Sequence, residues 1–503
     1  MTVKRIVCSL LCAAALLSCT FSVSAAPYRS YLFERETDTA LNSPAAAVPD
    51  GTVSGITLGV GSFKEPGDIF EDKSGYIYIL DSGNSRVVCL DEKLKNIRFV
   101  LKTENEFDFT GARGIFVNEG HIYIADTANA RILKFPVPDG GSSADEFAAA
   151  EIIKPTGLIL ENDTVFKPLK LAVDSMDRIF TVCEGVYDGL IELAPDGAFL
   201  AYVGSNKISL SVGERLWRMF ATREQWNASE KTVPVEFSNI TPDSEGFMFT
   251  TARGNSDGSL MIRRLNLSGA DVLNSDEDTV LGDKGLTPQD DSTYFVDVAV
   301  GGSEMFAGLD QTRGRVFVYN GDCEFLFEFG GLGSQVGCFK NPTALLWLSD
   351  NRFCVLDASA GEITLFSPTK YGSTLLSSVV NEVSGNYEAA REDYDAVLSM
   401  NSNNEYAYSG KGKQYYRNGD YKKALYYLKL GNNKQYYSKA FTEYRKEILN
   451  VAIPVFIICV IVLTVLLLSV SLYKKLRAAK KRIADIKEMS LKIRERREKE
   501  KSI

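Results

Sequence analysis

Histidine is almost absent from this chain, since His121 is the only one among 503 residues. Serine hydrolase triads, zinc hydrolases and two-histidine iron sites all require histidine beside other reactive groups. The sequence therefore argues against each of these classes of catalytic site.

Positive charge is also scarce over most of the chain. The net charge is −9, but residues 474–503 carry thirteen Lys and Arg against five Asp and Glu, and Lys4 and Arg5 add two more positive charges. The remainder must hold about −19. A main body this acidic speaks against nucleic acid as its partner.

Two apolar segments predict targeting and anchoring. Residues 1–25 have a basic start, an apolar stretch and a small-residue exit, which is the layout of a secretory signal peptide cleaved after Ala25. Leu16-Leu17-Ser18-Cys19 also resembles a bacterial lipobox, so a lipidated Cys19 is the alternative.

The second apolar segment, residues 448–473, contains no charged residue. Its core, residues 451–470, spans about 30 Å as a helix, which matches the hydrocarbon thickness of a bilayer. A basic cluster follows at once, and such flanks stay in the cytoplasm. We therefore predict a single-pass protein of the cell membrane, with residues 26–447 extracytoplasmic and a basic cytoplasmic tail at 474–503.

A β-strand pattern recurs between the two segments. Tyr76–Asp81 ends in Asp81 and is followed by Asn84 and Arg86, and the same order returns 45 residues later with Asp126, Asn129 and Arg131. Weaker copies end near Val182 and Thr250, and later ones end at Asp310 and Asp357. Each unit cannot bury both faces alone, whereas a ring of units can.

These units resemble the NHL-repeat family of six-bladed β-propellers, in the Pro66-Gly67 lead-in, the strand-end aspartates and the Asn-x-Arg continuation. The resemblance covers roughly residues 51–367. It implies an all-β six-bladed propeller, which we place at 51–370 behind an N-terminal segment or linker at 26–50.

The strand-end aspartates Asp81, Asp126, Asp310 and Asp357 allow two interpretations. They are either a carboxylate ring that binds a cation in the channel, or acceptors that fix the turns together with the Asn and Arg residues. We favour the second. Lactonases similar to this fold hold a divalent cation with carboxylates and an amide, a role open to Glu65, Asp174, Asn239, Asp243 and Asp297.

The pattern becomes helical after residue 371. Gly385, Tyr387 and Ala390 recur 34 residues later as Gly419, Tyr421 and Ala424. Residues 375–447 therefore resemble tetratricopeptide repeats, and one and a half to two units are visible. So few units need support from the propeller, the membrane or a partner.

The fold class is therefore multidomain: a six-bladed propeller, a tetratricopeptide-like all-α segment and one transmembrane helix. Cys323 and Cys338 flank a turn-rich stretch and are candidates for a disulfide. Leu476, Ile483, Ile486 and Ile493 form a stripe among basic residues, typical of a helix on anionic lipid, a short coiled coil or a solvated tail.

The predicted function is that of a membrane-anchored extracytoplasmic binding or scaffold protein. Protein partners are expected on the helical repeats, and a glycan or peptide ligand on the propeller. No cofactor or metal is assigned. The alternative is a surface-tethered lactonase-like hydrolase with a divalent cation in the channel, and a third hypothesis is assembly with an envelope transport system.

Overall fold

The computed structural model describes residues 26–34, 39–103, 105–138, 145–147, 150–160, 164–204, 236–252, 261–273, 279–283 and 293–500. The chain divides into two compact units, Met1–Gly410 and Lys411–Ile503, which are described separately. The predicted signal peptide lies outside the described residues, and so does Cys19.

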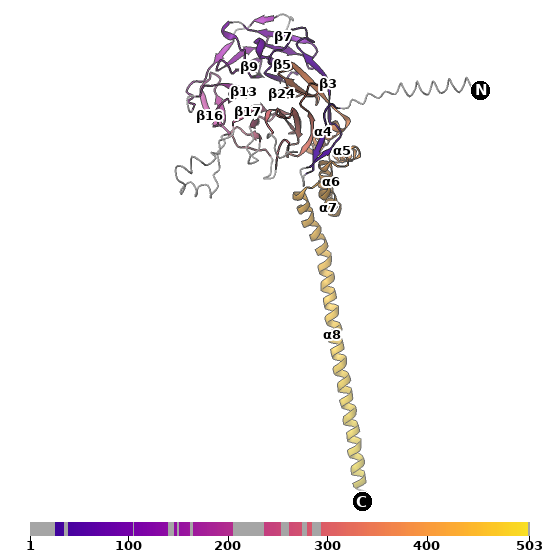
Figure 1. Ribbon diagram of the computed structural model, residues 1–503. Helices are drawn as coiled ribbons and strands as arrows, with labels where there is room; N and C mark the ends of the chain where they lie inside the picture. The colour runs from indigo at the N-terminus through magenta and orange to yellow at the C-terminus, as the bar shows by residue number, and fades with distance from the viewer. Residues whose placement is uncertain are drawn as a thin grey trace, which may run out of the picture. The chain divides into compact units, whose positions relative to one another are not determined.

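Six antiparallel sheets form the bulk of the first unit, and Figure 1 shows them arranged around a common centre. We number them as blades 1 to 6 in chain order. Blade 1 is β4 (Asp68–Glu71), β5 (Ile77–Asp81), β6 (Arg86–Leu90) and β7 (Ile97–Lys102); blade 2 is β8 (Gly114–Asn118), β9 (His121–Asp126), β10 (Arg131–Pro136) and β12 (Glu151–Ile153); blade 3 is β13 (Pro168–Val173), β14 (Ile179–Cys183), β15 (Leu190–Leu193) and β16 (Phe199–Val203). Blade 4 is β17 (Phe237–Pro242), β18 (Met248–Ala252) and β19 (Ile262–Leu265); blade 5 is β20 (Phe295–Val300), β21 (Phe306–Asp310), β22 (Arg315–Tyr319) and β23 (Phe325–Gly330); blade 6 is β24 (Pro342–Trp347), β25 (Phe353–Asp357), β26 (Glu362–Pro368) and β3 (Ala47–Ser54).

The first strands of the blades contact one another in the closed order β4, β8, β13, β17, β20, β24 and back to β4. This closed ring is a six-bladed β-propeller, as the repeat pattern predicted. The middle strands are buried along their whole length, as β5 and β25 show, because each blade is covered on both faces by its neighbours.

The blades differ in their outer strands. Blade 1 gains a fifth strand, β11 (Asp145–Phe147), which runs parallel to β7. Blade 4 has three strands among the described residues, and residues 205–235, which precede it, lie outside them.

The ring is closed by the N-terminal part of the chain. Strand β3 pairs with β26 from Ser54 opposite Glu362 to Ala47 opposite Pro368. Residues 26–50, which the sequence suggested only as an N-terminal segment or linker, thus overlap the outer strand of the last blade. They also form a hairpin of β1 (Tyr31–Phe33) and β2 (Ala40–Asn42).

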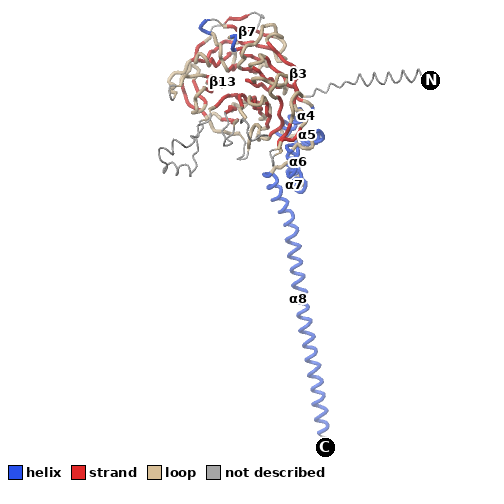
Figure 2. The backbone as a smooth tube through the Cα atoms, viewed as in Figure 1, coloured by secondary structure: helices blue, strands red, loops and turns tan. Residues whose placement is uncertain are grey.

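A helical region follows the last blade and is drawn in blue in Figure 2. Helix α4 (Lys370–Val383) begins directly after β26, and α5 (Tyr387–Met400) packs against it. Leu375, Val379 and Tyr394 belong to the same buried cluster as Phe329 and Phe366 of the propeller. The first helical hairpin therefore packs against the propeller. The propeller was one of the three stabilising contacts considered from the sequence, with the membrane and a partner protein.

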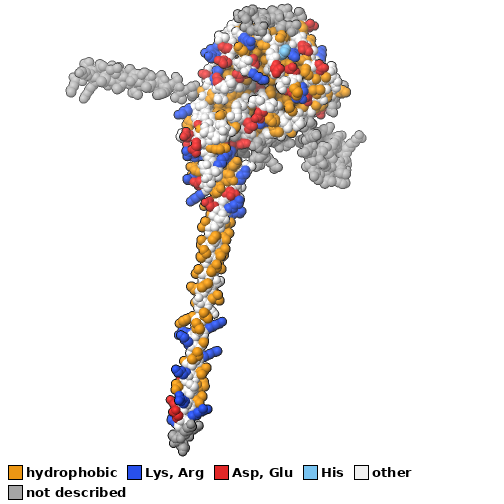
Figure 3. Space-filling model, turned by 180° about the vertical axis from the view of Figure 1, so that it is seen from behind, with side chains coloured by type: hydrophobic (Ala, Val, Ile, Leu, Met, Phe, Trp, Pro, Cys, Tyr) orange, Lys and Arg blue, Asp and Glu red, His pale blue; other side chains and the backbone are white. Residues whose placement is uncertain are grey.

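Helix α6 (Glu405–Arg417) leads into the second unit, which also contains α7 (Tyr421–Leu430) and α8 (Lys434–Glu500). Helix α8 contains a stretch that is long and apolar enough to cross a membrane, and its apolar side chains are exposed along that stretch. Figure 3 shows apolar side chains along this stretch on the visible face, with Lys and Arg gathered farther along the helix.

Candidate functional site

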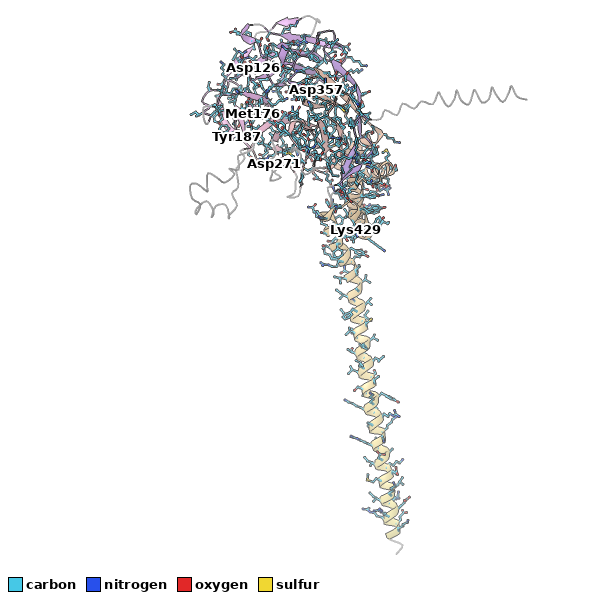
Figure 4. The ribbon with its side chains drawn as sticks, viewed as in Figure 1. Asp126, Met176, Tyr187, Asp271, Asp357 and Lys429 are labelled. Atoms are coloured by element: carbon cyan, nitrogen blue, oxygen red, sulfur yellow. The ribbon has the colours of Figure 1, made fainter. Side chains whose placement is uncertain are left out.

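A cavity of about 1080 Å³ lies in the centre of the propeller. All six inner strands line it, together with hairpin turns such as those of residues 174–176 and 243–247. Met176, labelled in Figure 4, belongs to these turns and is exposed. This hollow is large enough for a small ligand, and we call it the channel cavity.

One residue from each inner strand occupies an equivalent position around the channel. Each pairs with the next-to-last residue of the second strand of its own blade. In four of the six blades a bulge in the inner strand comes just before this pair. In blade order these residues are Asp68, Gly114, Lys170, Asn239, Asp297 and Ala344. Four of the six are polar, and all four are buried.

Lys170 of blade 3 forms an ion pair with Asp68 of blade 1. Asp68 also accepts hydrogen bonds from the backbone N–H groups of Ile69 at 3.0 Å and Ile115 at 2.9 Å. The lysine reaches across blade 2, whose equivalent residue, Gly114, has no side chain. The pair therefore ties three successive blades together.

Gly114 is predicted to be intolerant of any side chain. A Cβ atom there would lie 2.7 Å from the carbonyl oxygen of Leu169 and 2.9 Å from Cα of Lys170, both in the backbone of blade 3. We expect Gly114→Ala to cost about 2 kcal/mol, in the range of overpacked interiors. Thermal melting should show this loss, whereas Gly302→Ala, with no atom within 4 Å of its Cβ, should stay within about 0.5 kcal/mol of the wild type.

Asp297 of blade 5 repeats the arrangement of Asp68. Its carboxylate accepts hydrogen bonds from the N–H groups of Val298 at 2.8 Å and Leu345 at 2.6 Å, and from the side-chain amide of Asn239. Burial raises the pKa of Asp297 well above its ordinary value, repulsion from Asp68 raises it further, and Lys170 opposes both. Lys170 therefore pairs with Asp68 and opposes the protonation of Asp297.

The carboxylates suggested as cation ligands do not converge. Asp174 accepts from Nε of Arg178 at 2.8 Å, and Asp243 accepts from Nε of Arg264 at 2.9 Å. Glu65 is not among the residues that line the channel cavity. Within the described ranges no three His, Cys, Asp or Glu side chains are grouped to hold a metal. Arginine pairs with Asp174 and Asp243, and Asn239 pairs with Asp297, so the residues suggested for the lactonase-like alternative are engaged with other protein groups, apart from Glu65.

The walls of the cavity are mostly apolar and aromatic. Phe70 and Phe116 pack together with ring centroids 4.7 Å apart, and Phe247 and Trp347 also line the space. The indole N–H of Trp347 is buried and has no hydrogen-bond partner in the part of the chain that the structure describes. The walls offer stacking surface, whereas the polar floor is internally paired.

The turns after the second strands lie away from this cavity and use the residues that the repeat pattern singled out. Asp81 accepts from the N–H of Lys64 at 2.7 Å, Nδ2 of Asn84 at 2.8 Å and Nε of Arg86 at 2.6 Å. Gly67, which follows Pro66 in the lead-in, donates its N–H to the carbonyl oxygen of Leu80, the residue before Asp81.

Blades 2, 5 and 6 place their aspartates similarly, and Figure 4 labels Asp126 and Asp357 in separate blades. Asp126 accepts from Asn129 at 3.0 Å and from Nε of Arg131 at 2.7 Å. Asp310 and Asp357 accept backbone N–H groups, the latter from Lys340 at 2.6 Å. None of the four aspartates lines the channel cavity.

A second buried carboxylate fastens the N-terminal segment to blade 5. Glu328 forms an ion pair with Arg315 and accepts the N–H of Tyr31 at 3.0 Å. The guanidinium of Arg315 lies 4.9 Å from the centre of the Tyr31 ring, and Tyr31 donates its hydroxyl to Asp283 at 2.9 Å. The repeat pattern did not predict this cluster.

Glu328 predicts a dependence of stability on pH. Burial raises the pKa of Glu328 from 4.5 to about 7, although Arg315 and the Tyr31 N–H act in the opposite direction. The folded state thus binds a proton that the unfolded state releases between pH 4.5 and 7, so stability falls as pH rises through that window. Relative to Glu328→Gln, the wild type should lose about 3 kcal/mol between pH 4.5 and 8. Melting temperatures of both proteins across this range test it, and a constant difference between them would contradict it.

The helical repeat residues occupy matching places in their helices. Gly385 and Gly419 have φ of +78° and +77° just before α5 and α7, where a left-handed conformation favours glycine. Tyr387 and Tyr421 are the first residues of those helices, and Ala390 and Ala424 are fully buried. A small side chain at these two positions allows neighbouring helices to pack closely.

No disulfide joins Cys323 and Cys338 in the structure, so the suggested pairing is not formed. The two residues lie beyond opposite ends of β23, a strand of six residues. Six strand residues span about 20 Å, far more than the roughly 7 Å limit between Cα atoms of a disulfide.

The fold and the channel cavity define the class of protein as a six-bladed β-propeller with a C-terminal helical region. No family model and no curated protein matches the chain. Among solved structures, a streptogramin B lyase has 12% sequence identity and a TM-score of 0.36, over 60% of this chain and 78% of that one. Virginiamycin B lyase from Staphylococcus aureus has 10% identity and a TM-score of 0.36 over 60% and 80% of the two chains. The WD40 propeller domain of Doa1 has 10% identity and a TM-score of 0.36 over 64% and 97%.

Proposed function

We propose that this protein is a membrane-anchored, extracytoplasmic binding and scaffold protein. The observation that carries the proposal is α8, whose residues 448–473 contain no charge and expose apolar side chains such as Phe456, Ile461 and Leu468. Exposing so many apolar side chains to water is very unfavourable, whereas a bilayer would accept all of them.

The orientation follows from the flanking charges. The basic residues that begin at Lys474 favour the cytoplasmic side, and the predicted signal peptide at 1–25 directs the propeller across the membrane. Both features give the same topology, with residues 26–447 outside and 474–503 inside.

The channel cavity is the proposed ligand site of the propeller. Its floor groups are paired with one another. A ligand would therefore be recognised by the aromatic walls, the turns around Met176 and the indole N–H of Trp347, which has no partner among the described residues. Aromatic surface beside polar and charged side chains suits a glycan or a peptide. The strand-end aspartates and their Asn and Arg partners serve the fold in this proposal.

The helical segment is the proposed protein-binding part, as a tetratricopeptide-like repeat. Tyr387 is 44% exposed and Tyr426 is 62% exposed, and exposed tyrosine is favoured at interfaces. A buried core in α4 and α5 supports the helix that carries Tyr387.

Limited proteolysis of intact cells and of inverted membrane vesicles tests the topology. We expect the propeller to be cleaved in cells and protected in inverted vesicles, with the tail showing the opposite behaviour. Tail cleavage in intact cells with a protected propeller would overturn the proposal.

Binding at the cavity is tested with a panel of cell-envelope oligosaccharides and peptides. A ligand of the channel should bind the wild type and lose at least about tenfold in affinity with Trp347→Leu. The control variant Tyr187→Leu, at an exposed aromatic residue outside the cavity lining, should bind like the wild type. Equal affinities for all three proteins would place the ligand elsewhere.

A further inference from the structure

Helix α8 continues well past its apolar stretch. It runs without interruption to Glu500, and its only proline, Pro454, precedes the basic region. Residues 474–500 contain no glycine. A helix of this length without a breaker is about 40 Å long and straight, and it lies on the same axis as the apolar stretch.

An apolar stripe follows this part of the helix at coiled-coil spacing. Its members are separated by alternating intervals of four and three residues, with a polar Ser490 at one step: Leu472, Leu476, Ala479, Ile483, Ile486 and Ile493. Ile483 and Ile486 are each 65% exposed, and Ile493 is 50% exposed. These residues occupy the a and d positions of a heptad, and nothing in the described chain covers them.

The positions beside the stripe carry charge of one sign. Five of the six e and g positions between residues 480 and 496 are basic, and the sixth is methionine: Lys480, Arg482, Lys487, Met489, Arg494 and Arg496. Two parallel copies of this chain would place these like charges opposite one another, which destabilises the pair. The stripe is therefore poorly suited to self-association.

We infer that residues 472–497 of α8 bind a helix of another protein that has apolar a and d positions and acidic e and g positions. Such a partner buries the stripe and neutralises both basic flanks. This inference adds a partner class to the proposed scaffold function, and its binding step does not depend on the orientation of the membrane span.

Anionic lipid could attract the same charges, but the geometry favours a protein helix. A helix that lies on the bilayer surface must turn sharply where it leaves the apolar stretch. Residues 471–479 contain no proline or glycine and stay within α8. A straight helix instead carries the stripe away from the membrane surface.

The test uses the full chain in phosphatidylcholine nanodiscs and a synthetic four-heptad peptide with Leu at a and d and Glu at e and g. We expect this peptide to bind, and a peptide with Lys at e and g to fail. Ile486→Asn should weaken binding by at least about tenfold, whereas Leu491→Asn, on another face of the same helix, should leave it unchanged.

Charge reversal provides the second pair of variants. Arg482→Glu combined with Lys487→Glu should lower the affinity for the acidic peptide at least about tenfold. Lys481→Glu combined with Lys492→Glu, away from the e and g positions, should have little effect on this affinity. The inference is overturned if both pairs behave alike, or if the acidic peptide does not bind. It is equally overturned if cross-linking shows a dimer through the stripe, or if anionic nanodiscs protect Arg494 and Arg496 from trypsin. A reversed topology in cells would refute the proposed orientation and leave the peptide result standing.

Discussion

Replacing Lys170 by methionine is expected to lower the free energy of unfolding of the propeller by about 3 to 5 kcal/mol, the usual cost of removing one partner of a buried ion pair. The variant leaves Asp68 buried without its ammonium partner and removes the cation that stabilises the charge of Asp297. Thermal melting of the purified full chain at pH 7.5 measures the loss.

Two further variants make this prediction specific. Lys170→Met combined with Asp68→Asn should recover part of the stability, because the buried carboxylate that lost its ammonium partner is gone as well. Lys167→Met removes a lysine three residues away whose contact with Glu184, at 3.8 Å, is half exposed, and it should change stability by less than about 1 kcal/mol. Similar losses for Lys170→Met and Lys167→Met would show that the channel pair is not special.

A chain that lacks β3 is expected to lose on the order of 5 kcal/mol or more, and its melting temperature should fall by about 10 °C. Starting the mature chain at Gly55 removes all seven residue pairs between β3 and β26 and exposes the edge of blade 6. It also removes Ala46 and Ala47, which are buried against the propeller and α4.

The control for this truncation ends the chain at Leu430 and so removes α8. It deletes more residues than the N-terminal truncation, but none from the cluster that joins blades 5 and 6 to α4. We expect the melting temperature of its propeller to stay within a few degrees of that of the full chain. An equal fall in both truncations would mean that β3 does not close the ring.

The blades could be predicted from sequence because their signals are local. A strand ending in Asp81, a turn with Asn84 and a strand from Arg86 lie within a dozen residues, and the pattern returns often enough to be recognised. Strand β3 left no such signal, since its partner β26 lies more than 300 residues away and pairing over that distance has no periodicity.

The channel was harder to predict than the turns. Asn239 and Asp297 were named as candidates, and the structure brings them together, but as a hydrogen-bonded pair rather than as cation ligands. Lys170 was missed, although one lysine within an apolar inner strand (Leu169 to Val173) is an unusual pattern. The role of Lys170 depends on Asp68 in another blade and on the absence of a side chain at Gly114. The sequence around Lys170 contains neither piece of information.

The pairing of β3 with β26 also sets the order in which the protein can mature. The ribosome makes Ser54 about 310 residues before Pro368, the end of the strand it must join. At a synthesis rate of roughly 5 to 20 residues per second, β3 remains without its partner strand β26 for about 15 to 60 s. A chaperone that binds nascent chains would have to cover β3 during this interval. If β3 is left uncovered, we expect it to pair with β26 of another chain and to form domain-swapped dimers.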